Sequence, residues 1–314
     1  MHYDQRKVVL IGTGMVGTSY AYALLNQGIC NELVLIDLNA QRAMGEAMDL
    51  SHGLAFSSSH MRINAGTYAD CADADLVVIC AGVNQKPGES RLDLLQRNAE
   101  VFQSIVEPVV ASGFSGIFLV ATNPVDIMAR IVQQLSGFPA GRVMGSGTTL
   151  DTARLRYLLG EYFEVDPRNV HAYVCGEHGD SEFVPWSQAM VGTKPVLDLC
   201  VETQRSFDDL EKITEQVRGS AQVIIKAKQA TYYGIGMSLA RITRAIFSDE
   251  NSILTVSSQT NGEYGLHDLF IGLPTLVNRQ GVRKIIQLNL TPRELEILRG
   301  SAETLEESYR QLRL

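Results

Sequence analysis

The stretch Val8-Val9-Leu10-Ile11-Gly12-Thr13-Gly14-Met15-Val16-Gly17 contains the pattern that decides the fold. A short apolar run precedes three glycines with the spacing Gly-x-Gly-x-x-Gly, and a helical pattern follows over residues 15–27. The first glycine permits a tight turn, the second lets a pyrophosphate approach the backbone, and the third lets helix and strand pack closely. The helix N-terminus adds amide donors for phosphates. This stretch therefore predicts a strand, turn and helix that bind a dinucleotide.

Asp37 supports this interpretation, because it follows the next apolar run at about the distance that such units require. A carboxylate there accepts both hydroxyls of the adenosine ribose and repels a 2′-phosphate, so NAD is favoured over NADP. The alternative is a glycine turn before an ordinary helix, with Asp37 capping the next one.

The first half of the chain repeats the same alternation. Apolar runs without polar alternation predict buried strands at 8–11, 33–36, 76–81 and 117–121, and helical patterns lie between them, for example at 15–27 and 91–111. Strands that alternate with helices predict an α/β fold, a Rossmann-type doubly wound parallel sheet.

The second half has a different pattern. A helix is expected at 149–160, a strand at 170–174, one long helical pattern at 206–244, strands at 253–256 and 268–277, and a closing helix at 291–313 capped by Thr291 and Pro292. We therefore divide the chain into an NAD-binding domain, residues 1–145, and a mixed α+β substrate domain, residues 146–314, with the active site in the cleft between them.

Composition narrows the class of protein. The 314 residues are 45% hydrophobic and 20% charged with a net charge of −8, which is typical of a soluble globular protein and disfavours nucleic acid or an acidic membrane as a partner. The five cysteines form no Cys-x-x-Cys pair, so neither a disulfide framework nor a metal site is expected. Without a signal peptide or a long apolar stretch, the chain is expected in the cytoplasm.

Gly176-Glu177-His178-Gly179-Asp180 is the strongest candidate for chemistry. A histidine near neutral pH can exchange a proton, and flanking glycines let the backbone turn sharply beside a ligand. Two other interpretations remain open: a buried histidine bonded to a carbonyl, and a nucleophilic pair with the thiol of Cys175.

Together with Thr122-Asn123-Pro124-Val125-Asp126 and Leu150-Asp151-Thr152-Ala153-Arg154, this motif resembles the L-lactate/malate dehydrogenase family. The loop from Asn84 to Arg91 resembles the bacterial lactate branch of that family. The resemblance runs from Lys7 to the C-terminal helix. It implies an NAD-dependent oxidoreductase of the cytoplasm that interconverts pyruvate and L-lactate in fermentation, as a homotetramer.

The resemblance also implies roles for three side chains that reduce a 2-keto acid. His178 donates the proton, Asp151 orients its ring and raises its pKa, and Arg154 holds the substrate carboxylate in two parallel hydrogen bonds. Asp151 and Arg154 are three residues apart, which places them on one side of a helix. Without the resemblance, a salt bridge on the helix surface is the favoured interpretation of that pair.

Further substrate contacts are implied for Arg91, Asn123 and Thr231. Arg91 polarises the carbonyl when its loop closes, although a solvated loop arginine is the plain alternative. Gln85 decides the substrate, because a neutral side chain there leaves the second carboxylate of oxaloacetate unpaired. Malate and bulkier 2-hydroxy acids remain the alternative substrates, and a relative without activity is a further alternative that the complete set of catalytic residues disfavours.

The resemblance adds a set of cofactor contacts beyond the glycines and Asp37: Val16, Arg42, Tyr68, Gly82, Val83, Ser104, Ala121, Asn123 and Ser146. It also implies that Arg156 and His171 bind fructose 1,6-bisphosphate, an allosteric activator, at a subunit interface. Each could equally have only a structural role.

Overall fold

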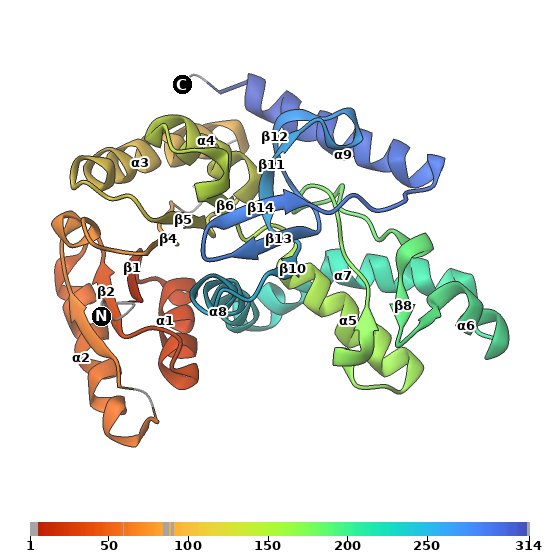
Figure 1. The fold of residues 1–314 in the computed structure, drawn as a ribbon, viewed down its shortest axis with the longest axis horizontal. Coiled ribbons are helices and arrows are strands. Elements are labelled where there is room, and N and C mark those ends of the chain that lie inside the picture. The colour runs from red at the N-terminus through yellow and green to blue at the C-terminus, as the bar shows by residue number, and fades with distance from the viewer. Residues whose placement is uncertain (1–5, 59, 84–87, 89–90, 313–314) are drawn as a thin grey trace.

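The structure is a computed structural model that describes residues 6–58, 60–83, 88 and 91–312, and only the backbone of Arg91. Strands and helices alternate through the first half of the chain, shown in red to green in Figure 1. These elements are β1 (Lys7–Ile11), α1 (Met15–Gln27), β2 (Glu32–Ile36), α2 (Ala40–Gly53), β3 (Arg62–Ala65), β4 (Leu76–Ile79), α3 (Arg91–Ala111), β5 (Ile117–Val120), α4 (Val125–Ser136) and β6 (Val143–Gly145).

The second half begins with a helix and then mixes short strands with helices. Its elements are α5 (Thr149–Phe163), β7 (Val170–His171), β8 (Met190–Val191), β9 (Lys194–Pro195), α6 (Val196–Glu202), α7 (Phe207–Lys228), α8 (Tyr233–Phe247), β10 (Ser252–Leu254), β11 (Ser257–Asn261), β12 (His267–Gly272), β13 (Thr275–Asn278), β14 (Gly281–Ile285) and α9 (Pro292–Arg310).

The main sheet has the strand order β12-β11-β6-β5-β4-β1-β2-β3 within the described residues. Strands β1 to β6 pair in parallel, and β11 joins β6 in the antiparallel direction. This arrangement confirms the expected Rossmann-type sheet. The chain crosses from one side of the sheet to the other beside β1, where such sheets bind their ligands.

The apolar runs lack alternation because both faces of the sheet are covered. Val8 and Leu10 contact a core that includes side chains of α1 and α8, whereas Val9 and Ile11 contact a core that includes α3, α4 and α9. Each of these four residues is at most 2% exposed. Buried on both sides, the central strand holds the glycine turn that follows it in a fixed position.

Several sequence-based boundaries are confirmed and others are wrong. The helices at 15–27 and 91–111 have the expected ends, and Thr291 and Glu294 form a capping box for α9. The strand expected at 170–174 ends at His171. Val174 bonds instead to the hydroxyls of Thr148 and Thr152, at 2.6 and 2.9 Å, so that segment is held by side chains rather than by a sheet ladder.

The single helix expected at 206–244 is also wrong. Gln229 ends α7 in the left-handed conformation, with φ of 71°, and α8 starts only at Tyr233. The strand expected at 268–277 is two strands, because Leu273 and Pro274 lie between β12 and β13. In both cases the apolar pattern continues through an interruption of the regular backbone, and periodicity alone does not reveal the break.

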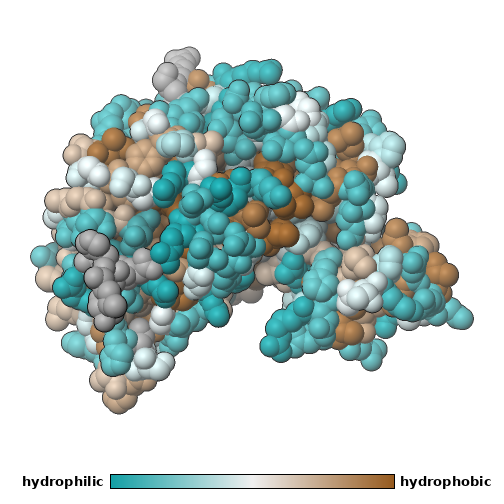
Figure 2. Space-filling view, viewed as in Figure 1, coloured by the Kyte–Doolittle hydropathy of each residue, from teal (hydrophilic) through white to brown (hydrophobic). Residues whose placement is uncertain are grey.

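The division at 145/146 stays a prediction. β11 and β12 come from beyond that point in the chain, yet they complete the sheet of the first half. Figure 2 shows a notch between the part that carries α1 and α2 and the projecting part that carries α6. Among the described helices, none has the length and apolar character of a membrane span.

The close contact of α1 with the turn before it gives a stability prediction. A Cβ at Gly17 would lie 2.0 Å from the carbonyl oxygen of Gly12, whereas a Cβ at Gly45 in α2 would meet nothing within 4 Å. We expect Gly17→Ala to lower the free energy of unfolding by about 2 kcal/mol or more. Gly45→Ala should raise it by up to about 1 kcal/mol, because alanine favours the helix.

Urea unfolding at one fixed protein concentration measures both changes. Equal effects of the two substitutions would contradict the close packing of α1 on the glycine turn.

Candidate active site

The loop from Cys175 to His178 is fixed by hydrogen bonds at every residue. Cys175 exchanges two bonds of 2.8 Å with Phe183, and Gly176 exchanges bonds of 2.9 and 3.0 Å with Gly272 in β12. The amide of Glu177 donates to Ser301 Oγ at 2.8 Å, and the amide of His178 donates to Asp126 Oδ2 at 2.9 Å. Side chains and strands from four different parts of the chain therefore position the histidine.

Gly176 is the glycine that this loop requires. Its φ is +102°, and a Cβ there would lie 2.8 Å from Ser301 Oγ. A side chain at this position would therefore displace the hydroxyl that holds the loop.

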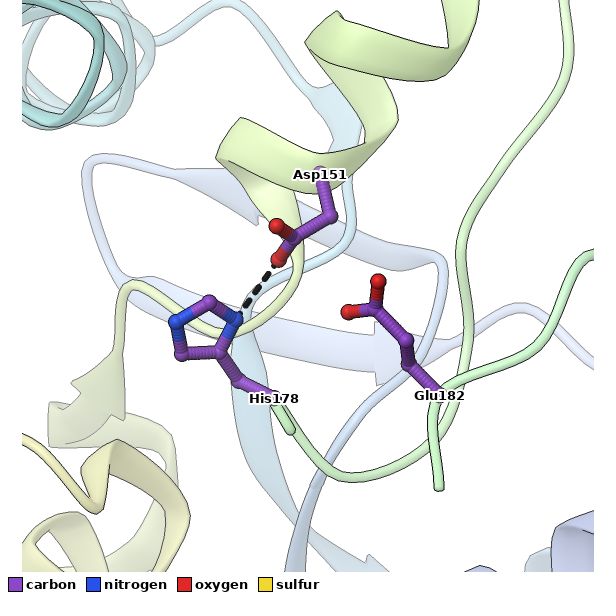
Figure 3. A group of neighbouring side chains, drawn as sticks. All are labelled: Asp151, His178 and Glu182. Atoms are coloured by element: carbon purple, nitrogen blue, oxygen red, sulfur yellow. Dashed lines mark hydrogen bonds and ion pairs between the residues drawn. The ribbon is translucent and has the colours of Figure 1, made fainter. Parts of the chain in front are cut away.

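His178 meets Asp151 at the start of α5, as the sequence predicted. The distance from His178 Nδ1 to Asp151 Oδ2 is 2.6 Å, and the second ring nitrogen points away from the carboxylate (Figure 3). Arg154 donates from Nη1 to Asp151 Oδ1 at 2.7 Å, one turn along the same helix. Asp151 therefore accepts from both cations through different oxygens, and the second nitrogen of His178 remains for a substrate.

Electrostatics favour the protonated ring. Burial lowers the pKa of His178, but the charge of Asp151 and its hydrogen bond outweigh burial and raise that pKa to about 9. Burial raises the pKa of Asp151, but His178 and Arg154 together bring it below its ordinary value. The interactions that raise the pKa of His178 also stabilise the fold. This stabilisation is fully present below pH 6.5, the ordinary pKa of histidine, and is lost as the pH rises through about 9.

The open alternatives for His178 lose support. Its ring bonds to a carboxylate, so it is not a core histidine satisfied by a carbonyl. Burial raises the pKa of the Cys175 thiol far above neutral, which keeps that group protonated and a poor nucleophile.

Two further buried acids lie beside His178, and the sequence reasoning assigned a role to neither. Asp126 is 2% exposed, and burial raises its pKa to about 6. Glu182 is also 2% exposed, and Asp151, His178 and Glu182 each offer a ligand atom within 4.8 Å of the others (Figure 3). Because Arg154 and the protonated imidazole oppose a metal cation there, we assign no metal ion to this group.

The glycine turn after β1 fits a dinucleotide. Gly12 has φ of +100°, and a Cβ there would lie 2.4 Å from the amide nitrogen of Ala81. The N-cap Gly14 leaves the first amides of α1 without a side-chain cap, and nothing lies within 4 Å of its ideal Cβ position. Free amides at a helix N-terminus beside open space are what a pyrophosphate needs.

Asp37 lies just beyond β2, at the carboxyl edge of the sheet. Its Oδ2 accepts from the amide and hydroxyl of Thr13 at 2.8 and 2.9 Å, and its Oδ1 accepts from the amide of Asn39 at 2.9 Å. Burial raises the pKa of Asp37, but these bonds outweigh it and leave the pKa below its ordinary value. The group is therefore a fixed anion next to the glycine turn.

The other predicted cofactor residues lie at or near the carboxyl ends of the central strands, or on helices beside them. Gly82, Val83, Ala121 and Asn123 follow β4 and β5, and Ser146 follows β6. Val83 donates from its amide to Asn98 Oδ1 at 3.0 Å, which fixes the chain before the loop. Val16 is half-buried in α1, Tyr68 half-buried in a short 3₁₀ helix, Arg42 exposed in α2 and Ser104 exposed in α3.

A cavity of about 580 Å³ brings two predicted substrate residues together. Asn123 and His178 both line it, and its other walls include Leu95 of α3 and Thr304 of α9. Thr231 lies between α7 and α8, not inside a helix. Gly234, at the start of α8, would place a Cβ 2.8 Å from Leu150, the neighbour of Asp151. The Gln85 assignment lies outside the described residues, and so does the side chain of Arg91.

Arg156 and His171 lie at adjacent places on α5 and β7. Arg156 donates from Nε to the carbonyl of Ala172 at 3.2 Å, and its guanidinium lies 5.4 Å from the ring centroid of Tyr173. The structure thus places the predicted effector residues in adjacent segments, with Arg156 half-buried and His171 exposed.

The comparisons with known proteins cover both halves of the chain. The model of the lactate/malate dehydrogenase NAD binding domain matches residues 6–145, and that of the lactate/malate dehydrogenase alpha/beta C-terminal domain matches residues 148–312. An L-lactate dehydrogenase of Priestia megaterium is 57% identical over 305 residues, which span 96% of this chain and 95% of that protein.

Solved structures agree. A minor L-lactate dehydrogenase of Enterococcus mundtii in the ligands-bound form has a TM-score of 0.97 at 50% identity, over 99% of each chain. Its ligands-unbound form has a TM-score of 0.92 at 48% identity, over 100% of this chain and 99% of that one.

Proposed function

Because the chain belongs to the lactate/malate dehydrogenase family and is an NAD-dependent oxidoreductase, we propose that it interconverts pyruvate and L-lactate. The observation that carries this proposal is the His178–Asp151–Arg154 group, in which buried Asp151 bonds to both cations and His178 lines a cavity. The relatives with this level of identity are named L-lactate dehydrogenases.

The proposed reaction assigns one task to each side chain. The nicotinamide of bound NADH supplies the hydride. His178 donates the proton to the developing alkoxide from its second nitrogen, while Asp151 fixes the ring and stabilises its charge. In lactate oxidation the same nitrogen accepts the proton, so the neutral ring is then required.

The side chain of Arg154 is held in a fixed position, as a group that binds a substrate carboxylate should be. Its side chain is 13% exposed, and one nitrogen is already bonded to Asp151. The rest of the guanidinium can hold a substrate carboxylate in two parallel bonds. We further assign Asn123 and Thr231 to the substrate pocket, and Arg91 to polarisation of the carbonyl by resemblance to the family.

The choice of pyruvate over oxaloacetate depends on Gln85. A neutral glutamine offers no partner for a second carboxylate, and an unpaired charge in a closed site is costly. Dehydrogenation of malate is therefore the weaker candidate function.

NAD fits the residues around the glycine turn. Gly12 and Gly14 would let the pyrophosphate approach the backbone, Gly17 would let α1 pack against the turn, and Asp37 would hold the adenosine ribose. We propose further cofactor contacts for Val16, Arg42, Tyr68, Gly82, Val83, Ser104, Ala121, Asn123 and Ser146. We also propose the division into domains 1–145 and 146–314, which the ranges of the two matched models support.

By resemblance to the family, we further propose a cytoplasmic homotetramer that regenerates NAD⁺ after glycolysis in fermentation.

We expect the purified protein to oxidise NADH with pyruvate at neutral pH, and to turn over oxaloacetate much more slowly. His178→Ala should remove turnover by about 10³-fold or more, because proton donation is lost, while NADH still binds. Loss of the near-ultraviolet absorbance of NADH measures turnover, and quenching of protein fluorescence measures binding. Near-normal turnover by His178→Ala would contradict the proton donor, and a preference for oxaloacetate would contradict the substrate.

We also propose that fructose 1,6-bisphosphate activates the enzyme through Arg156 and His171. The bisphosphate should lower the KM for pyruvate in the natural protein. The double substitution Arg156→Gln and His171→Gln should raise the bisphosphate concentration needed for half-maximal activation by about tenfold or more, because charge-assisted bonds to phosphate are lost. Arg168→Gln is the matched control, since Arg168 is an exposed arginine that pairs with Asp166.

Titration of the initial rate with the bisphosphate tests this site. A response that survives the double substitution unchanged would assign the pair a structural role only.

A further inference from the structure

Glu182 is held in place beside the catalytic pair by contacts of its own backbone. It follows the Gly176–Asp180 loop, and its carbonyl oxygen accepts two bonds from the guanidinium of Arg218 in α7, at 3.0 and 2.6 Å. The carboxyl group points to the space beside Asp151 and His178 (Figure 3). Each of these three residues places an oxygen or a ring nitrogen within 4.8 Å of the others.

The surroundings of Glu182 oppose a charge on it. Among the described residues none donates a hydrogen bond to its carboxyl group, whereas Asp151 accepts from both His178 and Arg154. The groups that face it carry charges of both signs: Asp151, Arg154, His178 and Arg218. Burial and the adjacent charge of Asp151 raise the pKa of Glu182, and they outweigh the three cations, which lower it, so that the pKa is about 8.

We propose that Glu182 is a positioning residue for the reaction proposed above, on which this inference rests. It stands beside the Asp151–His178 pair as a neutral acid in neutral solution, and it becomes a second anion for the imidazolium of His178 in alkaline solution.

The consequence concerns the pH range in which His178 keeps its proton. Burial disfavours the imidazolium, and the charges of Asp151, Glu182 and Asp126 oppose that effect. As the pH rises, ionised Glu182 adds a negative charge close to the ring, and the ring then holds its proton to a higher pH. Pyruvate reduction needs the protonated ring, so Glu182 extends reduction into alkaline solution. Lactate oxidation needs the neutral ring, so Glu182 also moves the onset of lactate oxidation to a higher pH.

The test compares Glu182→Gln with the natural protein in kcat/KM for pyruvate from acidic to alkaline pH. Glutamine keeps the shape and removes the charge. We expect equal values at low pH, and an alkaline midpoint lowered by about one pH unit, the shift typical of losing one nearby opposite charge. Glu182→Met, neutral and of similar length, should show the same midpoint and guards against an effect of glutamine itself.

Glu294→Gln is the matched control. Glu294 is a buried acid of α9, 9% exposed, that bonds to Ser187 and Thr291 rather than to the catalytic pair. The alkaline midpoint of the kcat/KM profile of Glu294→Gln should equal that of the natural protein. Profiles of Glu182→Gln and Glu182→Met that superimpose on the natural profile would overturn the proposal.

A second readout does not require turnover. Diethyl pyrocarbonate acylates only neutral imidazole, so its rate against pH, corrected with His178→Asn, reports the proton of His178 directly. The midpoint should again fall by about one pH unit without Glu182, and an unchanged midpoint would overturn the proposal. Failure of the natural protein to reduce pyruvate would contradict the proposed function alone, because this second readout still decides the role of Glu182.

Discussion

The hydrogen bond of 2.6 Å between His178 Nδ1 and Asp151 Oδ2 is the interaction on which the site depends. It joins a loop to a helix at a place where Asp151 is 2% exposed, so water cannot replace the partners of that carboxylate. Removal of Asp151 would take away the anion that His178 and Arg154 share, and breaking such a buried charge pair is strongly destabilising. The bond also leaves one ring nitrogen for the substrate. This one hydrogen bond thus positions the ring of His178, orients it and favours its protonated form.

Much of the remaining structure serves to place the two partners of that bond. The hydroxyl of Thr152 accepts from the amide of Val174 at 2.9 Å, which joins the start of α5 to the chain that leads to His178. Asp126 of α4 accepts the amide of His178 itself. Since α4 also packs against the main sheet, the cofactor turn and the catalytic loop belong to one rigid framework. The antiparallel strands β11 and β12 strengthen it by extending that sheet from the second half of the chain.

The sequence predicts the four strands β5, β4, β1 and β2, because strands covered on both faces leave apolar runs. It did not predict β3 and β6, which do not form such runs. It predicts the meeting of His178 and Asp151 only through resemblance, since periodicity carries no information on contacts 27 residues apart. The break at Gln229 was missed because a helical pattern resumes in a similar phase after it. Glu182 was missed because a charged residue after a loop looks solvated, and only the structure shows that it is buried. Gln85 and the side chain of Arg91 rest on sequence alone.

The ionisation of His178 tests the account most directly. The protein labelled with ¹⁵N in histidine would be titrated by NMR, and His178→Asn would identify the signals. The account predicts that both ring nitrogens carry protons at neutral pH and that the ring loses one near pH 9, because Asp151 holds the charge. A ring that is neutral at pH 7.5, or that titrates at its ordinary value of 6.5, would contradict the charge-stabilised proton donor.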